Sequence, residues 1–240
     1  MTGVLRFLIV EYEEVHQQGE TLALLVKWIR CAVGELDRRA FSEAQSKWSV
    51  IAGSLGFVGQ HGGWDIRAKS PTACIVCVWQ DIDSYTSFMG MLHDKTMDAN
   101  QQARTYSEIH VDHCDVVFPM PGAHEGLIEG IASGGSFLRV AECTVRADRV
   151  ESFLQVQRDI WVPAVASTPG MHGGLFLRSR TNPVSFTVLT SWASILEHDN
   201  YEKNRVPELR RRADVTADLE KLVGRFIPLE PRWSVAKIAE

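Results

Sequence analysis

The chain contains the same pattern of residues twice. Each pass has a phenylalanine, a glutamine and a tryptophan at helical spacing, then a glycine, then an apolar segment that ends in tryptophan. These markers are Phe41, Gln45, Trp48, Gly56 and Trp79 in the first pass, and Phe153, Gln157, Trp161, Gly170 and Trp192 in the second. Self-similarity at a fixed period indicates a duplicated structural unit. We therefore expect an extension at residues 1 to 22, unit 1 at 23 to 118, a glycine- and proline-rich linker at 119 to 136 and unit 2 at 137 to 235.

Both units predict the order strand, helix, strand, strand, helix, strand. In unit 1 the strands are expected at residues 23 to 33, 57 to 66, 72 to 80 and 106 to 118, with helices from 37 to 55 and from 81 onward. In unit 2 they are expected at 137 to 146, 170 to 180, 185 to 194 and 226 to 235, with helices at 148 to 167 and 195 to 225. This order is the split β-α-β, or ferredoxin-like, plan, and the fold class is α+β.

A four-stranded antiparallel sheet with helices on one face leaves its other face uncovered. Two such sheets can cover each other, which predicts an α/β barrel with a pocket between the halves. The sequence leaves open whether the barrel forms within one chain or between two chains of a homodimer.

Composition excludes several classes of function. The 240 residues carry a net charge of −5 and have a sequence pI of about 5.9, so nucleic acid is not expected as a partner. No apolar stretch reaches the roughly 20 residues of a membrane helix and no signal peptide is evident, so we expect a cytoplasmic protein without a membrane partner. The five cysteines are scattered and odd in number, which is typical of reduced buried thiols. Cys74 and Cys77 lie three apart on a predicted strand and point to opposite faces, so we expect no metal there.

The motifs of unit 1 resemble a known group of proteins. They are Phe41, Ala44, Gln45 and Trp48; Gly56, Phe57, Gly59, Gln60, Gly62, Gly63 and Trp64; Trp79, Asp81, Tyr85, Phe88 and Met89; and His93, Asp94, Gln101, Gln102, Thr105 and Tyr106. In these positions the chain is similar to the YdbC-type family of uncharacterised bacterial proteins. That family in turn resembles the dimeric α/β barrel superfamily, which includes antibiotic-biosynthesis monooxygenases, heme-degrading monooxygenases and chlorite-dismutase-like heme proteins.

The predicted alternation of strand faces selects candidate site residues. On the last strand of unit 1, Tyr106, Glu108 and His110 are expected to face the barrel, with His110 as a candidate general base. His61 and His172 both precede Gly-Gly, and because these glycines permit close approach of a ligand, both histidines are candidates for the pocket, His172 for substrate binding. Aligning the units by this motif makes the two histidines equivalent, whereas aligning them by the glycine that opens the strand pairs His172 with Val58 and agrees better with the helix spacing.

Aromatic residues and one further histidine complete the candidate set. Trp28, Trp64 and Trp79 are expected to form walls around a substrate. The resemblance implies a pocket tryptophan, for which Trp79 is the candidate, and in heme members an iron-binding histidine on the following helix, where this chain has His93.

The leading hypothesis is a small-molecule oxygenase that acts on an apolar or aromatic substrate without a cofactor, with His93, His110 or His61 moving a proton. A heme enzyme with iron bound through His93 is the enzymatic alternative. A non-catalytic ligand-binding or stress-associated protein is the alternative from a different class.

Overall fold

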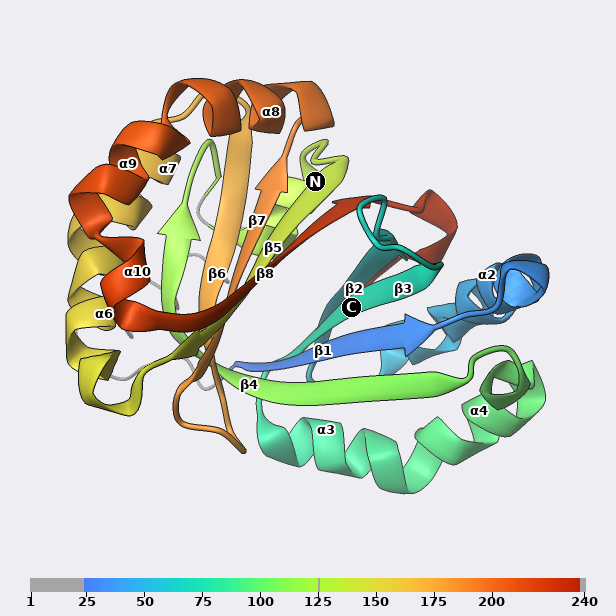
Figure 1. Ribbon diagram of the computed structural model, residues 1–240. Coiled ribbons are helices and arrows are strands. Elements are labelled where there is room, and N and C mark those ends of the chain that lie inside the picture. The colour runs from blue at the N-terminus through green and yellow to red at the C-terminus, as the bar shows by residue number, and fades with distance from the viewer. Residues whose placement is uncertain (1–23, 125, 238–240) are drawn as a thin grey trace.

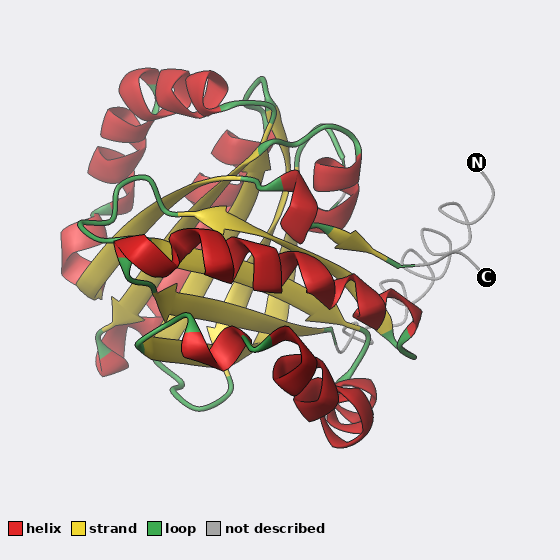
Figure 2. Cartoon of the chain, turned by 90° about the vertical axis from the view of Figure 1, so that its right-hand side faces the viewer, coloured by secondary structure: helices red, strands yellow, loops and turns green. Residues whose placement is uncertain are grey.

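A computed structural model describes residues 24–124 and 126–237. The extension expected at residues 1 to 22 lies outside the described residues. Figure 1 shows a strongly curved sheet with two groups of helices on its outer sides, one belonging to each half of the chain, and Figure 2 shows the same layering from the side. Among the described residues, no helix combines the length and the apolar character that crossing a membrane requires.

Unit 1 has the predicted order of elements. Its strands are β1 (Leu25–Ala32), β2 (Phe57–Trp64), β3 (Thr72–Trp79) and β4 (Glu108–Pro121). Its helical segments are the 3₁₀ turns η1 (Glu35–Asp37), η2 (Lys47–Gly53) and η4 (Gln102–Arg104), the α-helices α2 (Arg38–Ser46), α3 (Ile82–Phe88) and α4 (Asp94–Asn100), and the π-helical turn η3 (Met89–His93). The Asp81 carboxylate caps α3 by accepting a hydrogen bond from the Ser84 backbone N–H at 2.7 Å.

Unit 2 repeats this order after the linker helix α5 (Leu127–Ala132). Its strands are β5 (Phe137–Val145), β6 (Met171–Ser179), β7 (Ser185–Trp192) and β8 (Leu219–Pro228). Its helical segments are the 3₁₀ turn η5 (Ala147–Arg149), the π-helical turn η6 (Gln157–Trp161) and the α-helices α6 (Val150–Val156), α7 (Val162–Ala166), α8 (Ile195–Asn204), α9 (Val206–Ala213) and α10 (Val215–Asp218). The 3₁₀ turn η7 (Pro231–Trp233) and the short strand β9 (Val235–Ala236) follow.

The last strand of unit 2 begins earlier than the sequence predicted. A helix was expected up to residue 225 and a strand at 226 to 235, whereas helix ends at Asp218 and β8 spans Leu219–Pro228. The first half of β8 is mostly exposed and rich in charged side chains. It therefore lacks the alternation of apolar and polar residues that identifies a strand from sequence.

The described strands form one antiparallel sheet in the order β8-β5-β7-β6-β4-β1-β3-β2-β9. Each unit contributes the order fourth, first, third, second, and the two units join where β4 pairs with β6. At the other edge the backbone N–H of Ile66 donates to Phe226 and that of Glu230 donates to Gly62, at 2.9 and 2.8 Å. Both halves of the barrel thus come from one chain.

Glycine at position 63 permits the close approach of β2 and β8 at this edge. A Cβ atom there would lie 2.0 Å from the carbonyl oxygen of Pro228, so a side chain would force β2 away from β8.

The inside of the barrel is packed. Strands of both units and the linker helix contribute buried apolar side chains, among them Val26, Trp28, Val76, Leu127, Ile131, Leu138, Leu175 and Ile227. Cys74 belongs to this interior cluster, and Cys77 to a cluster under the helices of unit 1, so the two thiols lie on opposite faces as predicted. The expected placement of the substrate pocket between the sheets is therefore corrected, because large apolar residues fill that space.

Candidate functional site

Two cavities lie at corresponding places in the two units, between each sheet and the helices that cover its outer face. The unit 1 cavity has a volume of about 70 Å³ and the unit 2 cavity about 140 Å³. Nine structurally equivalent pairs of residues line them: 27 and 139, 29 and 141, 31 and 143, 45 and 157, 48 and 161, 75 and 188, 77 and 190, 79 and 192, and 88 and 201. The duplication visible in the sequence is thus a duplication of cavities.

Strand register establishes this equivalence for the pairs that lie on strands. Leu25 is opposite Trp79 in unit 1, as Phe137 is opposite Trp192 in unit 2. Counting from these pairs, Lys27 and Arg139 both occupy the third position of the first strand. Each unit therefore presents a cation to its cavity from the same place.

Lys27 is the unusual residue of the unit 1 cavity. It is 9% exposed, and its ammonium lies 5.4 Å from the ring centre of Tyr85. Burial lowers its pKa from the usual value, and the nearby thiols of Cys77 and Cys31 oppose that shift only in part. Lys27 is therefore an amine that gives up its proton more readily than an ordinary lysine.

A pair of buried glutamines fixes the wall opposite the sheet. The Trp48 indole N–H donates to the Gln102 side-chain oxygen at 2.5 Å, and the Gln102 amide donates to Gln45 at 2.7 Å. All three side chains are buried, so each of these polar groups needs its partner. The network holds the Trp48 ring at the edge of the cavity.

Three of the residues predicted from the sequence line this same cavity, namely Trp79, His93 and Tyr106. The His93 ring lies 5.7 Å from Trp48 and 5.8 Å from Phe88, and its Nδ1 is 2.8 Å from a carboxylate oxygen of the exposed Asp94. The Trp79 indole nitrogen is buried without a hydrogen-bond partner. Tyr106 faces the helices and not the barrel as expected, because it precedes β4 and the alternation of that strand does not reach it.

The remaining histidines and Glu108 lie elsewhere. His110 is 59% exposed on the barrel side of β4 and pairs with Glu108 at 2.9 Å. His61 is buried beside β9, with its Nδ1 3.1 Å from the Ser234 hydroxyl, and burial lowers its pKa to about 4. His172 hydrogen-bonds the Gly130 carbonyl at 3.1 Å, next to the linker helix.

The other two predicted tryptophans, Trp28 and Trp64, lie in packed clusters. Trp28 lies inside the barrel, where its indole N–H donates to Glu142 at 2.8 Å. Trp64 packs against Phe41 and Trp233, with ring centres 5.6 and 5.2 Å away. Neither contributes to the wall of either cavity.

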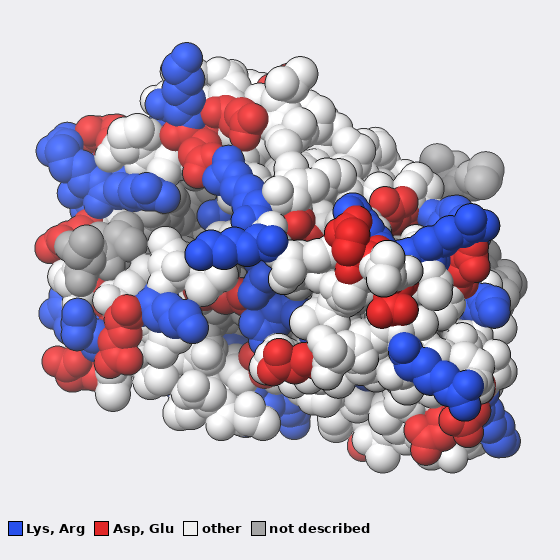
Figure 3. All heavy atoms as spheres, turned by 45° about the vertical axis from the view of Figure 1, so that its right-hand side comes forward, with Lys and Arg blue, Asp and Glu red and all other residues white. Residues whose placement is uncertain are grey.

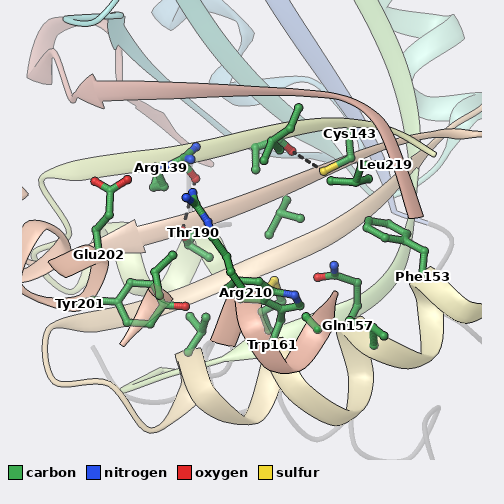
Figure 4. A pocket seen from close by; sticks show the side chains of 18 of the residues that line it. Arg139, Cys143, Phe153, Gln157, Trp161, Thr190, Tyr201, Glu202, Arg210 and Leu219 are labelled. Carbon is green, nitrogen blue, oxygen red and sulfur yellow. Dashed lines mark hydrogen bonds between the residues drawn. The ribbon is translucent and has the colours of Figure 1, made fainter. Parts of the chain in front are cut away.

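The unit 2 cavity has apolar walls and a charged side, and Figure 4 shows it from close by. Phe153, Val156, Trp161, Val165, Val188 and Trp192 supply apolar surface, and Arg139, Thr190, His198, Tyr201, Glu202 and Arg210 supply polar groups. Burial lowers the pKa of His198 to about 4, and Arg139 adds to this shift. His198 is therefore neutral near pH 7.

Sequence reasoning missed Lys27, Arg139 and the glutamine pair as parts of a site. A signal was present: Lys27 and Arg139 each lie in a mostly apolar strand, at the same distance before a cysteine, Cys31 in unit 1 and Cys143 in unit 2. A charged residue in a run that is otherwise apolar needs either a partner or a cavity. Gln45 and Gln102 were recognised in the sequence only as residues of a motif, because their contact joins residues 57 positions apart.

The cavities do not fit a heme. An engineered cavity of about 150 Å³ accommodates one benzene ring, and a porphyrin contains four pyrrole rings, whereas His93 faces a space of about 70 Å³. The ring of His93 also packs against the rings of Trp48 and Phe88, with ring centres 5.7 and 5.8 Å away.

One side-chain group in unit 2 has the composition of a metal site. His198, Asp199 and Glu202 on α8 place ligand atoms within 4.8 Å of one another. However, Glu202 pairs with Arg67 at 3.3 Å, and Arg139 lines the same cavity. These positive charges disfavour a cation at this position.

Comparison with known proteins places unit 1 in a family. A domain of unknown function, DUF4937, matches residues 25–114. The uncharacterized protein YdbC of Bacillus subtilis (strain 168) is 35% identical over 89 residues, which are 37% of this chain and 75% of YdbC. The matched residues include the whole wall of the unit 1 cavity and end before unit 2 begins.

Solved structures share the fold of the complete chain. A candidate monooxygenase from Fusobacterium nucleatum superposes with a TM-score of 0.73 at 12% identity, covering 91% of this chain and 96% of that one. An anthrone oxidase-like protein gives 0.69 at 12% identity, with coverage of 92% and 95%. A mutant chlorite dismutase from Candidatus Nitrospira defluvii gives 0.59 at 10% identity, with coverage of 92% and 96%. At these identities the likeness shows a common dimeric-type α/β barrel fold.

Proposed function

Because this chain belongs to the DUF4937 family, together with YdbC of Bacillus subtilis, and has the barrel fold of several monooxygenase-like proteins, we propose that it is a small-molecule oxygenase. Its substrate is a small electron-rich aromatic or enolic compound with an acidic C–H bond. The reaction takes place in the unit 1 cavity and needs no metal or organic cofactor. The fold alone does not carry this proposal, since one fold supports many activities.

The observation that carries it is the buried amine of Lys27 in an enclosed space with aromatic walls. A general base works best when its pKa lies near the working pH, and burial moves the pKa of Lys27 in that direction. The same residue, once protonated, stabilises a substrate anion in a medium of low dielectric constant. Trp48 and Tyr106 supply surfaces against which a flat substrate can stack, and the fully buried Trp79, which is stacked on Phe88, belongs to the closed wall.

The reaction balances without an added reductant. The neutral Lys27 amine removes a proton from a CH₂ group of the substrate, and the carbanion transfers one electron to O₂. The two radicals combine to form a peroxide anion, which takes the proton back from Lys27. Loss of water, with the second hydrogen of the CH₂ group, leaves a carbonyl, so that one CH₂ group and one O₂ give one C=O group and one H₂O.

His93 provides a route for protons between the cavity and solvent. Its ring lines the cavity, and its Nδ1 is 2.8 Å from Asp94, whose side chain is 88% exposed. We assign His93 to this exchange and Lys27 to the chemical step. A ring that needs more than about 70 Å³ requires movement of the unbranched side chains of Lys27 and Met97, which also line the cavity.

Oxygen consumption by the purified, chelator-treated protein tests the proposal. With a panel of one- and two-ring phenols and cyclic enols, we expect uptake of one O₂ per substrate above the rate of autoxidation, without release of H₂O₂. Lys27→Met keeps the shape of the side chain and removes the amine. Because base catalysis typically contributes about 10²- to 10⁴-fold, this variant should lose at least 100-fold of the enzyme-dependent rate.

The control is Lys47→Met, which removes an exposed lysine from the same unit and should keep full activity. The Lys27→Met protein should melt at or above the temperature of the unchanged chain, because it no longer buries an amine. If the panel binds but O₂ is consumed equally with and without Lys27, the cavity is a binding site and not an oxygenase.

A further inference from the structure

The second cavity differs from the first in the kind of cation that it contains. Lys27 of unit 1 can lose its proton, whereas Arg139 at the equivalent place in unit 2 keeps its charge under all physiological conditions. A permanent cation cannot act as a base, but it can hold an anion. The duplicated cavities therefore serve different purposes.

We propose that the unit 2 cavity binds a single-ring aromatic carboxylate, with the carboxylate on Arg139 and Tyr201 and the ring against Trp161 and the apolar side chains beside it. Nothing in this proposal depends on oxygenase activity in unit 1. The cavity volume of about 140 Å³ is close to the roughly 150 Å³ that accommodates one benzene ring.

Arg139 is held in place by contacts that leave its charge without an ion-pair partner among the described residues. Its guanidinium lies 4.6 Å from the ring centre of Phe226 and donates to the Val140 carbonyl. A side chain at Gly224 would meet a guanidinium nitrogen at 2.7 Å, so the glycine keeps this space open. Burial lowers the pKa of Arg139 and the opposing effect of Glu202 compensates only in part, so the site favours a further negative charge.

The carboxylates in the cavity wall are already paired. Glu202 lies 3.3 Å from Arg67, and the buried Asp218 lies 3.0 Å from Arg149. Arg210 adds a further positive charge to the wall. The wall therefore contains two arginines and two acids, and Arg67 and Arg149 neutralise the acids from outside the wall, which leaves the buried Arg139 as the cation that can attract an anion.

Two buried polar atoms of the cavity wall have no hydrogen-bond partner. They are the hydroxyl of Tyr201 and Nδ1 of His198, both on side chains that are almost fully buried. Figure 4 shows the Tyr201 hydroxyl directed into the cavity. A buried donor without a partner is costly, and a carboxylate in the cavity would accept from Tyr201 and from Arg139.

The apolar walls determine the other half of the ligand. Phe153, Val165 and Val188 are buried or nearly so and make that end mostly apolar, with the Gln157 amide as a polar group beside Phe153. Trp161 is partly exposed and offers a ring face or edge to a flat molecule, whereas Trp192 is 1% exposed and belongs to the closed wall. An aromatic ring with one carboxylate satisfies both ends, whereas an inorganic anion fills only one.

Calorimetric titration with benzoate, and with benzamide as its neutral counterpart, tests the proposal on the full chain. We expect benzoate to bind at least 10-fold more tightly than benzamide. Arg139→Gln should weaken benzoate binding at least 10-fold, since hydrogen bonds to charged groups are worth about 1.5 to 3 kcal/mol. Tyr201→Phe should weaken it several-fold, and Val165→Phe should abolish it by filling the cavity.

Arg180→Gln is the matched control, because it removes one arginine from an exposed pair with Asp115 outside the cavity and should leave benzoate affinity unchanged. Lys27→Met should also leave it unchanged, which separates this site from the proposed oxygenase. Arg139→Lys retains a cation and should restore part of the affinity. This result would show that the loss in Arg139→Gln comes from the missing charge and not from a folding defect. Equal affinity in Arg139→Gln, or the bromine of 4-bromobenzoate located outside this cavity in a crystal, would overturn the proposal.

Discussion

At the scale of single residues, strand register decides which histidines correspond. Phe57 and Met171 both lie opposite the marker tryptophans of their units, and each is followed by a bulge before Gly59 and Gly173. His172 therefore corresponds to Val58 and not to His61, as the second of the two sequence alignments indicated. The residues next to each histidine permit both alignments. Only the register of the hydrogen-bonded strands distinguishes them.

His198 gives a prediction at this scale. Its pKa is about 4 in the folded protein against 6.5 in the unfolded chain, so the unfolded state binds more protons between these values. Stability should therefore fall as the pH drops from about 6.5 to 4. Each pKa unit is worth about 1.4 kcal/mol, so His198 contributes up to about 3 kcal/mol to this loss.

His198→Phe should remove this part of the acid sensitivity. The ring is surrounded by Phe137, Trp192, Tyr201 and Phe226, and its Nδ1 makes no hydrogen bond and lies 3.8 Å from the exposed Asp199 carboxylate. Urea titrations at pH 7 and pH 5 measure the effect. We expect little change at pH 7 and a smaller loss at pH 5 than in the unchanged chain, and an equal loss would show that other groups cause the acid sensitivity.

At the scale of elements, the two units use different turns to bring one tryptophan to the cavity wall. Trp48 follows Gln45 by three residues at the start of a 3₁₀ turn, whereas Trp161 follows Gln157 by four residues across the π-helical turn η6. The wider turn accommodates one additional residue. Sequence periodicity predicted both helices. It could not predict that the second helix contains one additional residue before its tryptophan, because the tertiary packing of that tryptophan decides the local turn.

The linker helix α5 gives a prediction for an element. Leu127 is 1% exposed and packs into the interior cluster of the barrel. Leu127→Ala should lower the free energy of unfolding by about 3 kcal/mol, as for other buried leucines. Leu196→Ala, at a position that is 75% exposed, should change it by less than about 0.5 kcal/mol.

Chemical denaturation of both variants measures these differences. A small effect of Leu127→Ala would mean that α5 is not needed to seal the barrel interior.

At the scale of the whole molecule, charged groups inside the barrel link the two units. Glu142 of unit 2 accepts hydrogen bonds from Arg30 of unit 1 at 2.5 Å and from Arg225 at 2.7 Å, and Arg225 lies 3.3 Å from Asp65 of unit 1. Charged residues on the outer surface are of both signs and interspersed on the face that Figure 3 shows. The interior network is thus a distinct feature that connects the halves.

Glu142→Ala should destabilise the molecule as a whole. It leaves Arg30 and Arg225 without their shared carboxylate, and removal of one partner from a buried pair costs about 3 kcal/mol or more. Glu151→Ala, at an exposed position, is the control. Calorimetric unfolding should show one transition at a lower temperature for Glu142→Ala, and an unchanged transition would mean that the network contributes nothing net.

The sequence by itself determined the duplication, the order of elements and the fold, because marker residues, turns and apolar periodicity are local properties of the chain. Only the tertiary structure decided that the barrel interior is solid and that the cavities lie under the helices. A strand pattern identifies two faces but does not say which partner covers each one. Lys27 and Arg139 are candidate site residues because helices cover the face on which they lie. The same cations on a face exposed to solvent would be ordinary surface residues.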